Sequence, residues 1–203
     1  MLSEYRELLI GCGHDRNKKI EPRLCIKGMQ VPPAEHYQWH QLETIDYERS
    51  CNPGILWDLN QVPWSCPTTS HDGCLYEMLP DAWYDEIHAY EVLEHLGKQG
   101  DFRAFFEVFS EIWRLLKPNG LFVGTVPSRY SEWAWGDPGH TRMIPPCMLV
   151  FLNREAYQDQ QGKTTMTDYR KHYFGDFRTL HSSDDHKTHI FVLQAIKPAR
   201  DGV

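Results

Sequence analysis

Residues 83–127 read WYDEIHAYEVLEHLGKQGDFRAFFEVFSEIWRLLKPNGLFVGTVP and contain the clearest structural pattern in the chain. Apolar runs at 83–90 and 120–126 predict two buried strands. Between them, apolar side chains recur with a helical period along about four turns. These are Phe102, Phe105, Phe106, Phe109, Ile112, Trp113 and Leu116. With Asp101 as its N-cap and a Lys-Pro-Asn-Gly turn at its end, this helix joins the two strands and predicts an α/β sheet.

Shorter apolar runs on either side extend the predicted sheet. Upstream, three strands are expected at residues 5–10, 41–47 and 54–57. Downstream, we expect a helix over 146–158, two strands near 169–180 and 188–197, and a hairpin loop at 182–185. The sequence contains neither an internal repeat nor a long linker, so we predict one domain over residues 1–203.

Composition limits the class of protein. The net charge is 21 − 28 = −7, and so acidic a chain has no general field that would hold bulk nucleic acid. No apolar run approaches the roughly eighteen residues that span a bilayer, and the first residues lack the basic region of a signal peptide. The six cysteines are too few for a disulfide scaffold and are interpreted as thiols. We therefore expect a cytoplasmic protein without a membrane partner.

Glycine and aspartate follow the first three predicted strands, where α/β sheets place their ligands. Gly11 and Gly13 allow a tight turn with close approach of a ligand, Asp46 suits a ribose diol, and Asp58 suits an exocyclic amine. Each alone is equally compatible with an ordinary solvated turn. A dinucleotide fingerprint would need glycine where Arg16 stands and an acidic residue about 20 residues further on. Asp46 follows Gly13 by 33 residues, which argues against a nicotinamide or flavin.

Together, these segments resemble a class I S-adenosylmethionine-dependent methyltransferase and are most similar to the methyltransferase type 11 group. The resemblance covers residues 5–127 in the family's order. It rests on LLIGCG at 8–13, ID at 45–46, WDLN at 57–60, DEIHAYEVLEH at 85–95 and LKPNG at 116–120. It implies a Rossmann-like sheet of seven strands in the order 3-2-1-4-5-7-6, with strand 7 antiparallel and helices on both faces.

The resemblance also implies a cofactor site for S-adenosylmethionine. Its residues would be Gly11, Cys12, Gly13, Asp46, Tyr47, Asp58, Leu59 and Tyr90. Asp46 would hold the ribose hydroxyls, Asp58 and the backbone of Leu59 would meet the adenine, and Tyr90 would lie beside the methionine and the sulfonium.

The chain departs from the family pattern in two places. Asp15 replaces the usual third glycine. Residues 14–40 contain three prolines and a basic patch at 16–19, so a long loop with at most a short helix is expected instead of the usual first helix. The sequence begins at the first predicted strand, so we also expect it to lack the N-terminal helices that often cover the substrate in this family. Some other element, or a partner subunit such as a second copy in a homodimer, would then serve as the lid.

A second resemblance concerns a divalent metal. Glu91-x-x-Glu94-His95 is similar to the metal motif of ubiquinone-pathway O-methyltransferases and of small-RNA 3′-end 2′-O-methyltransferases. In the RNA branch a distant histidine completes the site, and His140 is the candidate here. The alternative is that the glutamate and histidine cap the next helix or touch the cofactor. Cys66, His71 and Cys74, in an expected loop before the fourth predicted strand, could bind zinc with Cys51, but their spacing matches no common zinc module and also suits free thiols.

The segment 127–142 follows the fifth predicted strand, and in this fold that loop faces the transferred methyl group. Trp133 and Trp135 could form a flat wall for a planar acceptor, His140 could be a general base, and Arg142 or Arg129 could anchor a carboxylate or phosphate. The alternative is structural: the tryptophans cover the edge of the sheet, and Arg142 pairs with an aspartate.

We therefore expect methyl transfer to a small-molecule O or N acceptor, with His140 as the base. One alternative is a non-catalytic S-adenosylmethionine-binding subunit or scaffold. Another is a metal-assisted O-methyltransferase acting on a vicinal diol or an RNA end, since the basic patch at 16–19 leaves a nucleotide possible. A nicotinamide-dependent oxidoreductase is disfavoured by Arg16.

Overall fold

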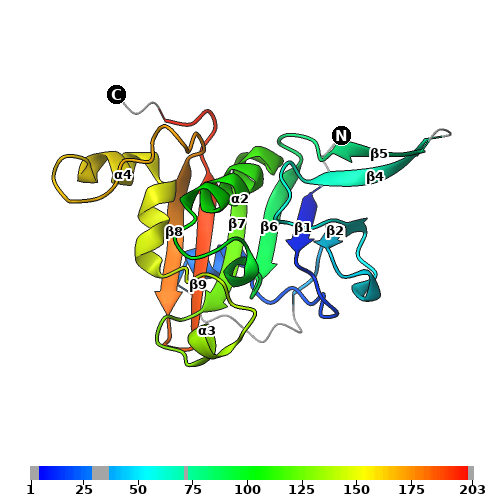
Figure 1. Cartoon of the computed structure of the whole chain (residues 1–203), viewed down its shortest axis with the longest axis horizontal. Coiled ribbons are helices and arrows are strands. Elements are labelled where there is room, and N and C mark those ends of the chain that lie inside the picture. Colours follow the sequence, from blue (N-terminus) through cyan, green and yellow to red (C-terminus); the bar gives the residue numbers. More distant parts are fainter. Residues whose placement is uncertain (1–4, 29–36, 71–72, 201–203) are drawn as a thin grey trace.

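Seven strands form one mixed sheet in the order β3-β2-β1-β6-β7-β9-β8 (Figure 1). The computed structural model describes residues 5–28, 37–70 and 73–200, and only the backbone of 68–70 and 73–76. The strands are β1 (Arg6–Ile10), β2 (Gln41–Asp46), β3 (Ile55–Leu56), β6 (Tyr84–Tyr90), β7 (Leu116–Pro127), β8 (Phe177–Asp184) and β9 (Thr188–Ala195). β9 is antiparallel to both neighbours, and the other pairs are parallel. Counted within this sheet, the order is 3-2-1-4-5-7-6, which confirms the prediction.

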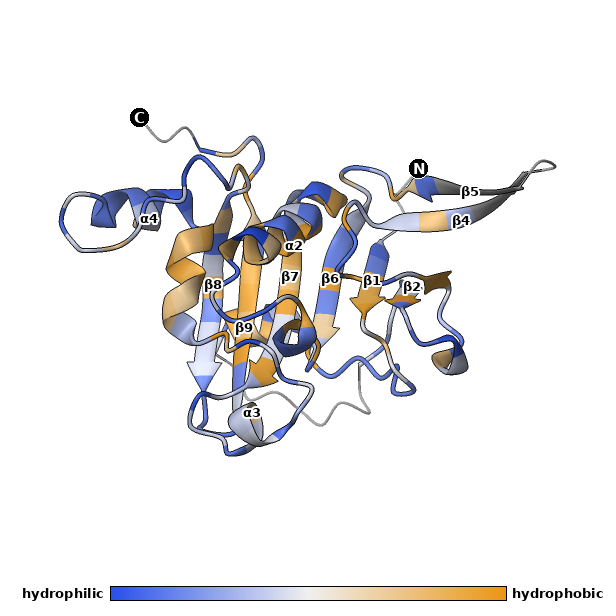
Figure 2. Ribbon diagram, in the orientation of Figure 1, coloured by the Kyte–Doolittle hydropathy of each residue, from blue (hydrophilic) through white to orange (hydrophobic). Residues whose placement is uncertain are grey.

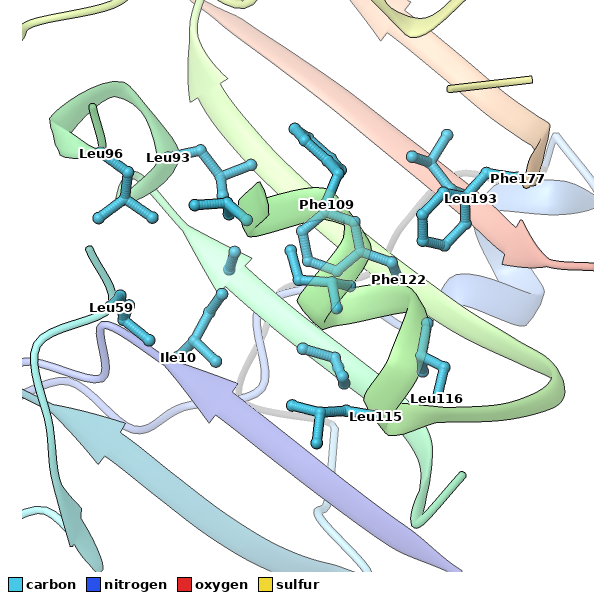
Figure 3. Packing of buried hydrophobic residues seen from close by; sticks show 14 of the residues in the cluster. Ile10, Leu59, Leu93, Leu96, Phe109, Leu115, Leu116, Phe122, Phe177 and Leu193 are labelled. Atoms are coloured by element: carbon cyan, nitrogen blue, oxygen red, sulfur yellow. The ribbon is translucent and has the colours of Figure 1, made fainter. Parts of the chain in front are cut away.

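Helix α2 (Phe102–Leu115) covers one face of the sheet (Figure 1). Its Phe109 packs against Phe122 of β7, with ring centroids 5.9 Å apart (Figure 3). Asp101 caps the helix, because its Oδ1 accepts a hydrogen bond from the backbone N–H of Ala104 at 3.1 Å. The predicted helix, its cap and its buried face are therefore confirmed.

Residues 12–28 cover part of the opposite face and contain only one short helix, α1 (Pro22–Ile26). Cys12, Ile20 and Cys25 are buried there against Leu9 and Val192 of the sheet. The expected long loop with a short helix is confirmed for 14–28 and 37–40. Residues 29–36 lie outside the described residues. Helices were expected on both faces of the sheet. Among the described residues, α1 is the one helix on this face.

Three downstream predictions were wrong in their bounds. The expected helix 146–158 is a 3₁₀ helix, η4 (Pro146–Leu152), followed by α4 (Arg154–Gln160). Asn153 separates them because its Oδ1 accepts from the N–H of Ala156 and starts a new helix. The expected strand 169–180 begins only at Phe177 and continues through the predicted loop to Asp184. The hairpin turn is shorter, since Asp185 accepts hydrogen bonds from the N–H groups of Lys187 and Thr188.

An antiparallel hairpin stands apart from the main sheet. It consists of β4 (Ser65–Ser70) and β5 (Gly73–Met78) and extends away from the body of the molecule (Figure 1). The loop expected here is therefore wrong for residues 65–70 and 73–78. His71, the central residue of the suggested zinc ligands, lies outside the described residues. Among the described residues, no helix has the length and apolar character needed to cross a membrane.

Candidate functional site

The turn after β1 requires glycine at its first position. Gly11 has a φ of +59°, and a Cβ there would lie 2.2 Å from Cγ2 of Val92. Gly13 has a φ of +52°, but space around its missing Cβ is open. The N–H of Gly11 donates to the carbonyl of Ile45 at 2.9 Å, which ties the turn to the end of β2. The turn is thus closely packed on the side of β6 and open at Gly13.

Asp46 joins the ends of β1 and β2. Its side chain is buried, with 6% of the residue exposed. Oδ2 accepts from the N–H of Gly13 at 2.9 Å, and Oδ1 accepts from the N–H of Glu48 at 2.9 Å. A carboxylate has about four acceptor positions, so this one keeps capacity for two further donors. Tyr47, which follows, is exposed.

The segment 57–60 continues this arrangement. The N–H of Trp57 donates to the carbonyl of Asp46 at 2.9 Å, and Asp58 follows directly. Oδ1 of Asp58 accepts from the N–H of Asn60 at 2.9 Å. Leu59 points into the core, and its carbonyl accepts from the indole of Trp64. The structure therefore links the Gly13 turn, Asp46 and the residue before Asp58 by consecutive hydrogen bonds.

Tyr90 is directed into the molecule. Glu86, His88 and Tyr90 lie on one face of β6, which shows hydrophilic residues in the middle of the sheet (Figure 2). Burial lowers the pKa of His88, so its ring is neutral. Nε2 lies 2.9 Å from the Glu86 carboxylate and must donate to it, so Nδ1 accepts from the Tyr90 hydroxyl at 2.7 Å. The Tyr90 hydroxyl also accepts a hydrogen bond from the N–H of Ile20, so it is held under the segment 12–28.

Lys18 lies at the centre of this buried polar network. Only 1% of it is exposed, and its Nζ lies 2.6 Å from Glu7, 3.0 Å from Glu86 and 3.2 Å from Glu21. Burial alone would lower the pKa of Lys18, but the carboxylates of Glu86 and Glu7 raise it above its ordinary value. Sequence reasoning missed this network. The sequence signal for it was an acidic residue inside each of two central strands, Glu7 in β1 and Glu86 in β6.

A second polar cluster contains Glu94, His95 and His140. Glu94 and His95 belong to the 3₁₀ helix η3 (Leu93–His95) after β6, and one donor atom from each of the three residues lies within 4.8 Å of the others. Glu94 is 2% exposed, and neither carboxylate oxygen has a hydrogen-bond partner among the described residues. Nε2 of His140 is 3.9 Å from Oε1 of Glu94. Burial, together with the charges of Glu91 and Asp137, raises the pKa of Glu94 to about 8.

Two neighbours shape this cluster. Nδ1 of His95 lies 2.9 Å from the carbonyl of Gly139, to which it can donate a hydrogen bond. Nε2 is then the ring atom that is available to a metal ion. Glu91 has a φ of +54°, a strained conformation for this residue type, and is exposed. Its carboxylate does not belong to the group of close donor atoms. The structure therefore brings together two residues of the predicted metal motif and the distant histidine.

The loop after β7 presents tryptophan to solvent. Trp133 and Trp135 lie on the short helix α3 (Trp133–Gly136), near the ends of β7 and β9 (Figure 1), and are 67% and 72% exposed. Neither side chain is buried. Arg142 is 6% exposed, and its Nη2 donates to the carbonyls of Lys98 and Asp101 at 2.9 and 2.6 Å. The structural alternative, an aspartate paired with Arg142, is not found among the described residues.

Comparison with known proteins identifies the fold. No protein-family model matches the sequence. A probable S-adenosylmethionine-dependent methyltransferase of Mycolicibacterium smegmatis is 34% identical over 82 residues, which are 38% of this chain and 30% of that protein. The chain thus spans less than a third of the length of that relative.

Two solved structures share the architecture. A SAM-dependent methyltransferase from Archaeoglobus fulgidus is 14% identical, with a TM-score of 0.51 over 95% of this chain and 86% of that chain. The complex of the Haloferax volcanii Trm112 methyltransferase activator with a methyltransferase gives 12% identity and a TM-score of 0.51, over 95% and 83%. The predicted resemblance is confirmed at the level of the fold: the chain has the fold of the class I S-adenosylmethionine-dependent methyltransferases.

Proposed function

We propose that this protein transfers a methyl group from S-adenosylmethionine to a small-molecule O or N acceptor. The observation that supports this most is the hydrogen bond from Gly13 to Asp46, which joins the ends of two neighbouring strands. The site fits an adenosyl group because the turn is open at Gly13 and Asp46 retains acceptor capacity for a ribose diol. Asp58 directly follows Trp57, whose N–H donates to the carbonyl of Asp46, and would meet the adenine.

When bound, S-adenosylmethionine supplies an electrophilic methyl carbon. The acceptor oxygen or nitrogen would bond to this carbon as the carbon–sulfur bond breaks and S-adenosylhomocysteine leaves. The part of the protein would be to position the reactants and to remove a proton from the acceptor. His140 is the proposed base, since it lies on the loop after β7 beside Glu94. The exposed Trp133 and Trp135 offer flat apolar surface for the acceptor.

The cofactor assignment is tested with Asp46→Ala. We expect S-adenosylhomocysteine to bind at least tenfold more weakly, because the variant loses hydrogen bonds to a charged acceptor. Calorimetry measures the affinity, and circular dichroism confirms folding. Asp159→Ala is the matched control, since Asp159 is an exposed aspartate of α4, away from the turn at Gly13. Unchanged affinity in Asp46→Ala would refute the ribose assignment.

The role of His140 is tested separately. His140→Ala should reduce turnover about a hundredfold or more while the affinity for S-adenosylhomocysteine stays within about twofold of wild type, because a base acts only on the acceptor proton. Exposed His186→Ala serves as the control. Equal losses of turnover and cofactor affinity would show that His140 supports the fold instead.

A partner subunit is part of this proposal. Trp133, Trp135 and the open turn leave the site exposed, and a similar fold occurs in complex with a methyltransferase activator. A second copy of the chain or another subunit would then cover the acceptor. If the chain is instead a non-catalytic S-adenosylmethionine-binding subunit, it will bind the cofactor but show no turnover across a broad acceptor panel.

Metal-assisted O-methylation of a vicinal diol or an RNA end is the second candidate function. It is favoured by Glu94, a buried carboxylate without a partner among the described residues. With the imidazoles of His95 and His140, it forms a donor set that suits a borderline divalent ion, and the carbonyl of Gly139 orients His95. These three residues would hold the metal, which would supply Lewis-acid activation of a hydroxyl. Glu91 would complete the site only after its side chain moves inward.

Mn²⁺ titration followed by electron paramagnetic resonance tests this candidate without turnover. Wild type should bind the ion, and Glu94→Gln should weaken binding at least tenfold because it removes the buried carboxylate. Glu107→Gln, on the exposed side of α2, is the control. Equal binding by wild type and Glu94→Gln would remove this candidate.

A further inference from the structure

A cleft of about 180 Å³ lies at the N-terminal end of α2. Its walls are largely aromatic and apolar, and they come from α2, η4 and the segment after α4. The apolar residues are Phe102, Phe105, Phe106, Met148, Phe151 and Tyr169. A neighbouring cavity of about 120 Å³ shares the lining residues Phe106, Phe151 and Tyr169. Since an apolar cavity of about 150 Å³ holds benzene, this cleft has room for one six-membered ring.

Arg142 supplies a cation to this apolar cleft. Its Nη2 is fixed by the carbonyls of Lys98 and Asp101, and its guanidinium carbon lies 5.3 Å from the centre of the Phe105 ring. Nε is buried and has no hydrogen-bond partner among the described residues. No carboxylate of these residues lies within ion-pair distance of the guanidinium. Burial lowers the pKa of Arg142, and the negative charge of Asp101 offsets this lowering only in part.

The surroundings restrict the charge and shape of a ligand. A buried arginine without a carboxylate is stabilised by an anion that replaces its lost hydration. Asp101 also lines the cleft, where its Oδ1 caps α2. Its negative charge repels a dianionic ligand more strongly than a monoanionic one. Stacked and tilted rings on the walls favour a flat apolar body, as in the pair Phe102 and Tyr169 at 4.9 Å.

We propose that this cleft binds a small carboxylic acid with a flat apolar body, its carboxylate at Arg142 and its body between the aromatic side chains. The N–H of Arg142 donates to the carbonyl of Glu94 at 3.1 Å, and His140 stands two residues earlier. The cleft therefore adjoins the cluster that contains the proposed base. That this acid is the methyl acceptor is a step that rests on the proposed function, whereas the binding site itself does not.

Calorimetry with the full chain and without cofactor tests the site, with benzoate, its neutral isostere benzamide, and phenyl phosphate as probes. We expect benzoate to bind at least tenfold more tightly than benzamide, because only benzoate compensates the charge of Arg142. Phenyl phosphate should bind more weakly than benzoate because of Asp101. Equal affinities for benzoate and benzamide would overturn the proposal, and preference for phenyl phosphate would overturn the assignment of a carboxylate.

Two variants locate the binding. Arg142→Met should abolish the preference for benzoate, but it also removes bonds that hold two loops. Met148→Trp therefore provides a second test, since it fills the cleft and leaves Arg142 in place. It should weaken benzoate binding at least tenfold, and undiminished binding would contradict the site. Arg49→Met, a change at an exposed arginine shortly after β2, should bind benzoate as wild type does.

The same variants separate this inference from the proposed function. Met148→Trp should leave the affinity for S-adenosylhomocysteine unchanged, because the cleft and the strand ends near Gly13 are different parts of the molecule. Benzoate binding without any binding of S-adenosylhomocysteine would keep the cleft and refute methyl transfer. S-adenosylhomocysteine binding without benzoate binding would refute the cleft and leave the proposed methyl transfer standing.

Discussion

Lys18 is a cation in the interior of the protein, held by carboxylates on two central strands. Removing one member of such a group leaves uncompensated charge in a medium of low polarity, which costs about 3–5 kcal/mol. We therefore expect Lys18→Met to lower the free energy of unfolding by about this amount, measured by urea denaturation.

Lys19→Met is the matched control for this prediction. Lys19 is adjacent in sequence, but its side chain is 41% exposed and pairs with Asp15 at the surface. Such pairs contribute at most about 1 kcal/mol. Similar losses in the two variants would contradict the buried network.

The sequence could not distinguish these two lysines. Arg16, Lys18 and Lys19 stand close together and were interpreted as one basic patch, open to a nucleotide. In the fold, Lys18 turns inward to Glu7 and Glu86, so the patch at the surface is weaker than the sequence suggests. Which lysine is buried depends on carboxylates 11 and 68 residues away, a relation that local patterns do not contain.

Strand β7 contains a glycine, Gly124, and an aromatic ring from the neighbouring strand β9 fills the space where a side chain would stand. Gly124 pairs with Phe191 of β9, and a Cβ at Gly124 would lie 2.3 Å from that ring. Gly124→Ala should therefore lower the free energy of unfolding by about 1–3 kcal/mol, as overpacking does. Thermal denaturation measures the effect.

A double variant identifies the cause. Phe191→Leu removes the ring, so Gly124→Ala should cost less in that background than in wild type. Gly136→Ala is the control, because nothing lies within 4 Å of its missing Cβ. If Gly124→Ala costs the same with and without the ring, crowding against Phe191 is not the reason.

Elements with a strong periodic pattern were predictable, and those governed by single turns were not. Helix α2 has an apolar face and an N-cap, so both its identity and its start follow from the sequence. Strand β7 begins earlier than expected, since Leu116 pairs with Tyr84 before an irregular segment and Leu121 resumes pairing with Glu86. The break at Asn153 depends on whether its side chain caps a helix, which the apolar pattern does not reveal.

Acid should destabilise the whole molecule through the network on β1 and β6. Burial alone would raise the pKa of Glu86, but His88, Lys18 and the hydroxyl of Tyr5 lower it well below its ordinary value of 4.5. The unfolded chain therefore takes up a proton near pH 4.5 that the folded chain still excludes. The contribution of Glu86 to stability is fully present above that pH. It is lost as the pH falls from the pKa of Glu86 in the unfolded chain toward its lower pKa in the folded chain.

Urea denaturation between about pH 6 and about pH 3 measures this dependence. Wild type should lose stability steeply below about pH 4.5, and Glu86→Gln, though less stable at neutral pH, should lose less on acidification. Glu107→Gln, at an exposed position of α2, should follow wild type. An equal slope in wild type and Glu86→Gln would contradict the assignment.

The site as a whole was predictable where strand ends fix it. Parallel strands end at the same edge of a sheet, so Gly13 and Asp46 meet although 33 residues separate them. The inward direction of Tyr90 and the exposure of Trp133 and Trp135 were not predictable. Those orientations depend on the loop at 14–28 and on α3, whose paths no apolar period determines.

The account depends on an adenosyl group held at the ends of β1, β2 and β3. Titration calorimetry of the wild-type chain with S-adenosylhomocysteine, and separately with NAD, tests this directly. We expect one S-adenosylhomocysteine to bind per chain and NAD to show no saturable heat. Binding of NAD, or failure of the folded chain to bind S-adenosylhomocysteine, would contradict it.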